Sequence, residues 1–361
     1  MRGANWLWTT ILAVLCLATS GLASEVDSNE SIATIIESYE GAPFTGRVLV
    51  QRAGRLLHSR TYFQSTHDTD LEATDTRYHL PGLTKAVTAA AIMSLATDGR
   101  LNVDEPINNY LPTVFRASHW NPVTVHHLLT HSSGIADYSD ESDRYDTAGG
   151  FLTESGVGDV IVASGASPLL HEPGARVTFS NVGYLILGRI VESISKQSFG
   201  SFVADRLFLP LEMNESTIAA SSTDLNGTSD SGAAKIAKSI ADPGRPISDA
   251  DGGLVTTSSD IRRWINLLSG IHQEALASDA VSEILHKHIE IGEGGAADWM
   301  GYGLYVGDRM VFNFGIRCTL IVDRLTQIGI VVISDAPHDN SAIGFQILSE
   351  LLKPPSASED E

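Results

Sequence analysis

Residues 76–95 read Thr-Arg-Tyr-His-Leu-Pro-Gly-Leu-Thr-Lys-Ala-Val-Thr-Ala-Ala-Ala-Ile-Met-Ser-Leu, and this stretch decides the fold. Its alanine-rich part predicts a buried helix from Thr84 to Asp98, because alanine is the best helix former and the Ile, Met and Leu side chains supply apolar surface. Gly99 is expected to end the helix. Lys85 stands near the start of this apolar element, where a buried ammonium group needs partners.

Strand patterns occur at both ends of the chain, with helical patterns between them. A hairpin is predicted from Gly46–Arg52 and Arg55–Phe63, turned at Ala53-Gly54. Further strands are predicted at 303–306, 310–314, 318–322 and 327–334, and helices at 182–199, 261–268 and about 342–352. Ser258-Ser259-Asp260 is a candidate cap for the second of these helices. The polar stretch 221–251 predicts a surface loop. The sheet is therefore expected to be closed by distant parts of the chain.

The start of the chain predicts export. Arg2 precedes an apolar run over 7–18 and small residues over 21–24, which is the layout of a secretory signal peptide at 1–24. We expect a secreted or periplasmic location, with no membrane association once the signal is removed. The alternative is an uncleaved membrane anchor, which the missing stop-transfer pattern disfavours. The last residues, 353–361, predict a disordered tail.

The composition narrows the classes of partner. The 361-residue chain is 43% hydrophobic, which is ample for a packed core, and its formal net charge is −20. Such an acidic protein is expected to repel nucleic acid and anionic membrane surfaces. Cys16 would leave with the signal peptide, so that Cys318 stands alone and an internal disulfide is not expected.

Several sequence blocks resemble the family of serine β-lactamases, penicillin-binding DD-peptidases and related esterases, closest to its class C branch. After 76–95 come Gly99-Arg-Leu-Asn-Val-Asp-Glu-Pro106, Val123-Thr-Val-His-His-Leu-Leu-Thr-His-Ser-Ser-Gly134, Glu172-Pro-Gly174, Phe179-Ser-Asn181 and Gly252-Gly-Leu-Val-Thr-Thr-Ser-Ser-Asp260, in the family's order. The resemblance covers nearly all of 40–350. It implies an α/β (α+β) fold in which an antiparallel sheet is flanked by helices and a helical subdomain is inserted.

The resemblance also implies a division of the chain. We expect one β-lactamase-like domain at 25–352, with a sheet subdomain at about 40–95 and 252–352 and a helical subdomain at about 96–251. The family reaction needs no cofactor, and none is expected here.

Three family motifs carry the chemistry, and each is altered in this chain. The nucleophilic serine of Ser-x-x-Lys is replaced in Gly82-Leu83-Thr84-Lys85, although the lysine is present. The proton-shuttling tyrosine of Tyr-x-Asn is replaced in Phe179-Ser180-Asn181, although the asparagine remains. The Lys or His of the last motif is replaced in Asn313-Phe314-Gly315.

These losses predict that acylation is gone, because covalent catalysis requires an activated nucleophile. Removing the nucleophile of a hydrolytic triad costs on the order of a million-fold in turnover, whereas roughly a thousand-fold over water can persist from the oxyanion hole and binding. We therefore expect a non-catalytic binding protein for a small-molecule or peptidoglycan- or peptide-like ligand, or for a protein partner. The alternatives are a weak hydrolase that activates a water molecule with Lys85, and a structural or assembly protein.

Individual residues allow more than one interpretation. Lys85 and Asn181 are candidate ligand-binding residues, but Lys85 could equally be a structural lysine satisfied by Asn181 and backbone carbonyls. Gly82 could expose N–H groups to an anion or could serve a capping turn.

Other candidate groups have weaker support. Thr84 points about 200° around the helix from Gly82, and Ser132, Ser133 and Ser180 are expected to be scaffold residues. His127 and His131 are four residues apart but lack the interior Glu of a metal motif, so no metal site is predicted. Asp137, Tyr138 and the run 140–146 are expected to form a solvated loop rather than a cation site.

Overall fold

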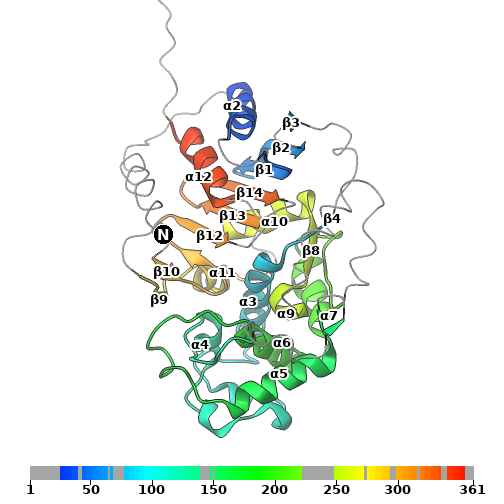
Figure 1. The fold of residues 1–361 in the computed structure, drawn as a ribbon, viewed down its shortest axis with the longest axis vertical. Helices are drawn as coiled ribbons and strands as arrows, with labels where there is room; N and C mark the ends of the chain where they lie inside the picture. The colour runs from blue at the N-terminus through cyan, green and yellow to red at the C-terminus, as the bar shows by residue number, and fades with distance from the viewer. Residues whose placement is uncertain are drawn as a thin grey trace, which may run out of the picture.

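The protein is described here by a computed structural model, which covers residues 25–39, 43–63, 66–67, 77–138, 147–148, 151–221, 248–271, 275–292, 298–314, 318–334 and 340–353 (Figure 1). The predicted signal peptide, the acidic run 140–146, Gly315 and the tail from 354 onward lie outside the described residues.

A nine-stranded antiparallel sheet joins the two ends of the described chain. Its order is β3 (Thr66–His67), β2 (Arg55–Phe63), β1 (Gly46–Arg52), β14 (Ile328–Ser334), β13 (Cys318–Asp323), β12 (Met310–Phe314), β11 (Tyr305–Val306), β10 (Trp299–Met300) and β9 (Ile289–Glu290). Strand β1 pairs with β14 so that Val48 lies opposite Val332. The prediction that distant parts of the chain close the sheet is therefore confirmed, as is the fold class.

Helices cover both faces of this sheet (Figure 1). Helices α2 (Glu25–Glu37) and α12 (Asn340–Leu351) lie on one face, where Val48 and Val50 contribute to their apolar cluster. Leu49 points the other way, into the cluster that contains α3 (Pro81–Thr97), because successive strand residues face opposite sides of a sheet. All seven residues of β14 are buried, as expected for a strand covered on both faces.

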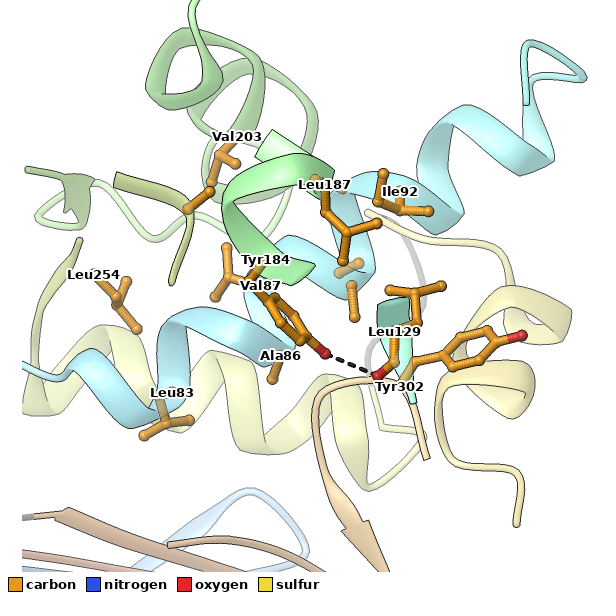
Figure 2. Packing of buried hydrophobic residues seen from close by; sticks show 14 of the residues in the cluster. Leu83, Ala86, Val87, Ile92, Leu129, Tyr184, Leu187, Val203, Leu254 and Tyr302 are labelled. Carbon is orange, nitrogen blue, oxygen red and sulfur yellow. Dashed lines mark hydrogen bonds between the residues drawn. The ribbon is translucent and has the colours of Figure 1, made fainter. Parts of the chain in front are cut away.

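Helix α3 lies between the sheet and the helical part of the molecule (Figure 1). The helical part contains η1 (Ile107–Asn109), η2 (Thr113–Phe115), η3 (Ser118–Trp120), α4 (Val125–Leu129), α5 (Glu154–Ala166), α6 (Asn181–Ser195), α7 (Phe199–Val203) and η5 (Ala204–Phe208), with the short hairpin of β5 (Thr147–Ala148) and β6 (Phe151–Leu152). Figure 2 shows Val87 and Ile92 of α3 packed with Leu129, Tyr184 and Leu187. This packing holds α3 in the middle of the protein's larger apolar cluster.

A second, three-stranded sheet lies beside α3, in the order β4 (Arg77–His79), β8 (Leu254–Thr257) and β7 (Thr217–Ile218). The one-turn helix α9 (Asp249–Gly252) precedes β8, and α10 (Ser258–Leu268) and α11 (Ser278–Ile284) follow it. Polar side chains of α3 bind this region: the Thr88 hydroxyl donates to the carbonyl of Ala250 (2.6 Å), and the amide of Leu254 donates to Thr84 Oγ1 (2.9 Å).

Some sequence predictions at element boundaries were wrong. Helix α10 is capped by Thr257, whose hydroxyl accepts from the Asp260 amide, rather than by Ser258-Ser259-Asp260. The end of the predicted loop 221–251 forms α9 and is buried at Asp251, while 222–247 lie outside the described residues. Helix α2 was not predicted, and its residues Ile32, Ala33, Ile35 and Ile36 are buried.

Two further findings concern the whole described chain. Cys318 is a buried free thiol. Within the ranges that the structure describes, every helix is too short or too polar to cross a bilayer.

Candidate functional site

Helix α3 begins at Pro81, and Gly82 is its second residue. Proline suits the first helical position, because its missing N–H would have no partner there. The preceding Leu80 makes no side-chain cap. Gly82 is absent from the glycines with positive φ, so its backbone lies in a conformation that any L-residue adopts. The backbone at this position therefore does not require glycine.

The third motif lies directly against the first. Asn313 on β12 is buried, and its side-chain Nδ2 donates to the carbonyl oxygen of Gly82 at 2.8 Å. The carbonyl can only accept, so the amide must present its nitrogen here. The Asn313 Oδ1 is enclosed without a hydrogen-bond partner among the described residues. The structure thus brings the vestigial positions 82 and 313 together through a direct bond.

Lys85 is turned into the protein one helical turn after Gly82. The residue is 9% exposed, and its ammonium group donates to the carbonyl of Asp251 at 3.0 Å. The same nitrogen lies 5.3 Å from the ring centre of Phe179 and 5.4 Å from that of Tyr184. Such contacts stabilise a cation, because the ring face carries partial negative charge.

Three neighbouring aromatic rings lie close to this lysine, with His131 stacked on Phe179 and tilted against Tyr184. His131 lies 4.8 Å from Phe179 and 5.0 Å from Tyr184, measured between ring centres. The Tyr184 hydroxyl donates to the carbonyl of Leu129 (3.0 Å), as the dashed line in Figure 2 marks. Phe179 is 51% exposed, so that the substituted second motif presents an apolar ring to solvent where a phenol would have carried a proton.

Burial controls the ionisation of this cluster. Burial lowers the pKa of Lys85, and the charges of Asp251 and Asp137 oppose that shift. Burial likewise raises the pKa of Asp251, against the effect of the Lys85 charge. Burial and the neighbouring Lys85 charge lower the pKa of His131 to about 3, so that its imidazole is neutral at physiological pH.

Asn181 bonds to Asp137 rather than to Lys85. Its backbone N–H donates to Asp137 Oδ1 at 2.8 Å, and its side-chain Nδ2 donates to Asp137 Oδ2 at 3.2 Å. The prediction that Asn181 satisfies Lys85 is therefore wrong for the hydrogen bonds of the described residues. Position 137 was also misjudged as part of a solvated loop, since its carboxylate holds the first turn of α6 through the pair of bonds.

Asp251 is the site residue that sequence reasoning missed. The carboxylate is buried and accepts from the Ser248 amide (2.5 Å) and from the hydroxyl of the buried Tyr138 (3.3 Å). Tyr138 is therefore a core residue and not part of a solvated loop. Ser248 and Asp251 form a capping box for α9, and their spacing of three residues was the available sequence signal.

The hydroxyl groups considered as alternative nucleophiles make hydrogen bonds inside the protein. Thr84 is fully buried, and its hydroxyl donates to the Leu80 carbonyl while accepting from Leu254. Ser180 is buried, with its hydroxyl directed at the carbonyl of Ala136 (3.4 Å). Ser132 bonds to Thr130. None of these three hydroxyls is placed as an exposed nucleophile.

His127 and His131, the two histidines of the metal hypothesis, each accept a hydrogen bond from a different backbone amide. His127 Nδ1 accepts from the Thr124 amide in the capping box of α4. His131 Nδ1 accepts from the Ser180 amide at 3.3 Å. Within the part of the chain that the structure describes, no group of three or more His, Cys, Asp or Glu side chains is arranged to hold a metal ion.

The position one helical turn before Lys85 lacks the group that the family chemistry would use. Nucleophilic catalysis requires a hydroxyl or thiol within hydrogen-bond reach of a base, and the residue one turn before Lys85 carries no side chain. Among the described residues of this region, the Phe179 ring is exposed, whereas Asp137 and Asn181 are partly buried.

The chain is similar to known proteins over most of its length. The sequence model of the family described as Beta-lactamase matches residues 41–347. The chain is 29% identical over 197 residues to Protein flp of Staphylococcus aureus (strain MW2), a match that covers 53% of this chain and 38% of that protein. It is also 29% identical over 195 residues to Penicillin-binding protein 4* of Bacillus subtilis (strain 168), covering 53% and 42%. These matches span less than half the length of either relative.

Solved structures share the fold. A penicillin-binding protein homologue from Pyrococcus abyssi, described as octameric, superposes with a TM-score of 0.69 at 21% identity, covering 93% of this chain and 79% of that one. The D-amino acid amidase of Ochrobactrum anthropi, in complex with D-phenylalanine, superposes with a TM-score of 0.69 at 19% identity, covering 90% and 98%. Since the family model spans most of the sequence, this chain belongs to the Beta-lactamase family of serine hydrolases.

Proposed function

We propose that this protein is a non-catalytic binding member of its family, exported from the cytoplasm, that recognises a D-amino-acid-containing or peptidoglycan-like ligand. The observation that carries the proposal is the bond between Asn313 and the Gly82 carbonyl, where the family places its nucleophile and the third motif. Both positions lack a group that could attack or transfer a proton.

The surroundings of the Lys85 ammonium group support the same proposal. In the family this lysine assists the attacking serine. Here its ammonium group is directed at the Asp251 carbonyl and enclosed by aromatic rings. Two carboxylates, at 137 and 251, act on its charge, so the centre has no excess positive charge to attract a carboxylate ligand. We therefore expect ligand contacts through the exposed Phe179 ring and the amide of Asn181.

The choice of ligand class rests on the relatives. A structural neighbour is described as an amidase complexed with D-phenylalanine, and sequence relatives include a penicillin-binding protein. An aromatic side chain such as that of D-phenylalanine can stack on Phe179, and a stacked pair contributes about 0.5–1.5 kcal/mol beyond burial.

Calorimetric titration tests the proposal. D-phenylalanine amide, its L-enantiomer and a peptide that ends in D-Ala-D-Ala with an amidated C-terminus are titrated into the protein, and each mixture is then assayed for released product. We expect saturable binding with preference for the D-ligands, no measurable turnover, and weaker binding by Phe179→Ala. Equal binding of the enantiomers, or none, would reject the ligand class.

The water-activating hydrolase remains the second candidate, because burial lowers the pKa of Lys85 toward that of a usable base. The turnover arm of the titration decides between the two. Steady product release that is lost in Lys85→Met would establish this alternative and overturn the binding proposal.

A further inference from the structure

We infer that a second site, separate from Gly82 and Lys85, binds a small ligand carrying a phosphate-like dianion. The site is a pocket of about 420 Å³ between the end of α10, helix α11 and the turn after β13. This volume lies within the range of pockets that hold small molecules. Its polar lining consists of Ser269, Ser278, Ser282, His286, Lys287 and Arg324.

The lining combines donors and positive charge. Three of its described residues are basic types and three carry hydroxyl groups, and its remaining members are Leu, Val and Gly, so that no described lining residue is acidic. The whole chain has a formal charge of −20. An acidic protein that gathers lysine, arginine and histidine around one concave site has a local field suited to an anion.

Asp308, outside the lining, neutralises only part of this charge. Its carboxylate pairs with the Lys287 ammonium group, but its side chain is 94% exposed. An exposed pair of this kind contributes little and is easily exchanged for another partner. Arg324 Nη2 donates only to the backbone carbonyl of Asp308, at 3.4 Å. The guanidinium group therefore lacks a carboxylate partner among the hydrogen bonds of the described residues.

Two donors at this site are incompletely satisfied. Arg324 Nε and Ser269 Oγ are enclosed and have no hydrogen-bond partner among the described residues. A buried donor left unpaired is unfavourable. A dianion that draws these side chains toward the pocket would supply the missing acceptors, and a guanidinium group matches the geometry of a phosphate with paired donors.

Thermal melting with defined probes tests the site. The mature protein is titrated with inorganic phosphate and, separately, with glycerol 3-phosphate, at constant ionic strength, with chloride and glycerol as references. We expect a saturable rise in melting temperature with the phosphate probes only. Tighter binding of the ester would indicate a phosphorylated metabolite, and equal binding would indicate free phosphate.

Variants locate the binding. Arg324→Gln should weaken phosphate about ten-fold, the effect of losing one charge-assisted bond, and Ser282→Ala should weaken it in the same direction while leaving the charges intact. The control is Arg263→Gln on α10, which lies outside the lining and has a side chain that is 36% exposed. The proposal would be overturned if phosphate did not raise the melting temperature of the parent protein. It would also be overturned if the rise in Ser282→Ala and in Arg324→Gln were as large as in the parent. If Arg324→Gln does not fold, Ser282→Ala decides.

Discussion

At the scale of single residues, Lys85 interacts with both the backbone carbonyl and the carboxylate of Asp251. Its ammonium group reaches the Asp251 carbonyl, and the Asp251 carboxylate opposes the effect of burial on the lysine pKa. The two charges therefore interact, although the hydrogen bond itself goes to the backbone carbonyl of Asp251. Removing the lysine leaves this carbonyl without its donor, which costs about 1–3 kcal/mol, and leaves the buried carboxylate without a neighbouring positive charge.

We therefore predict that Lys85→Met lowers the unfolding free energy by about 3 kcal/mol. Lys353→Met is the matched control, because its side chain is 60% exposed and makes an exposed pair with Glu350. It should change stability by less than about 0.5 kcal/mol. Urea unfolding of both variants measures the difference. In the double variant Lys85→Met/Asp251→Asn the loss should be smaller than the sum of the single losses. Strict additivity would show that the two residues are not coupled.

The vestigial motifs allow a restoration experiment. Gly82→Ser, Phe179→Tyr and Asn313→His together should recover measurable hydrolysis of an activated ester, because the serine would regain a neighbouring proton carrier. Gly82→Ser alone should give much less. If the single variant matches the triple variant, then positions 179 and 313 do not correspond to catalytic residues.

At the scale of elements, α3 and the turn between β10 and β11 are fitted closely. Gly303 has a φ of 73°, and a Cβ built there would lie 2.6 Å from the Lys85 carbonyl oxygen. Contacts under 3.0 Å require the backbone to move. The turn thus presses against the helix at the residue that faces the candidate site.

Gly303→Ala should therefore destabilise the protein by about 2–4 kcal/mol, from the unfavourable φ and the clash together. Gly99→Ala isolates the first effect, since its φ is 68° and nothing lies within 4 Å of the added Cβ, so its cost should be about 1 kcal/mol. Thermal or urea unfolding compares them, and equal losses would mean that the turn does not press on α3.

Sequence patterns predicted the regular elements better than the site. The hairpin at 46–63 and the C-terminal strands followed from alternation and turn residues, which are local signals. The contact of Asn313 with Gly82 joins residues 231 positions apart, and the resemblance to a family, rather than any local pattern, pointed to it. The burial of Asp251 could not be predicted from composition, because the polar sequence around it is typical of a surface loop.

At the scale of the whole molecule, buried histidines link stability to pH. Burial lowers the pKa of His79 to about 4 and of His131 to about 3, from an ordinary value of 6.5. The unfolded chain therefore binds protons that the folded chain excludes. The stability contributed by these groups is present above pH 6.5 and is lost as the pH falls toward those values. Asp251 and Asp249, whose pKa values burial raises, act in the opposite direction.

His131→Asn isolates one contribution. Asparagine tolerates the backbone of this position, where φ is 54°, and its amide oxygen can accept from the Ser180 N–H. The stability difference between parent and variant should shrink by about 1.4 kcal/mol per pH unit between pH 6 and pH 4. Urea unfolding at several pH values measures it, and a constant difference would contradict a buried neutral imidazole.

Intact-mass measurement shows whether this protein has lost acyl transfer, as we propose. The protein is incubated with penicillin and with an activated ester, denatured and weighed, with the triple restoration variant as a comparison. We expect an unchanged mass for the natural sequence, because Gly82 carries no hydroxyl group. A stoichiometric mass increase that survives denaturation would contradict it, and mapping the adduct would identify the nucleophile.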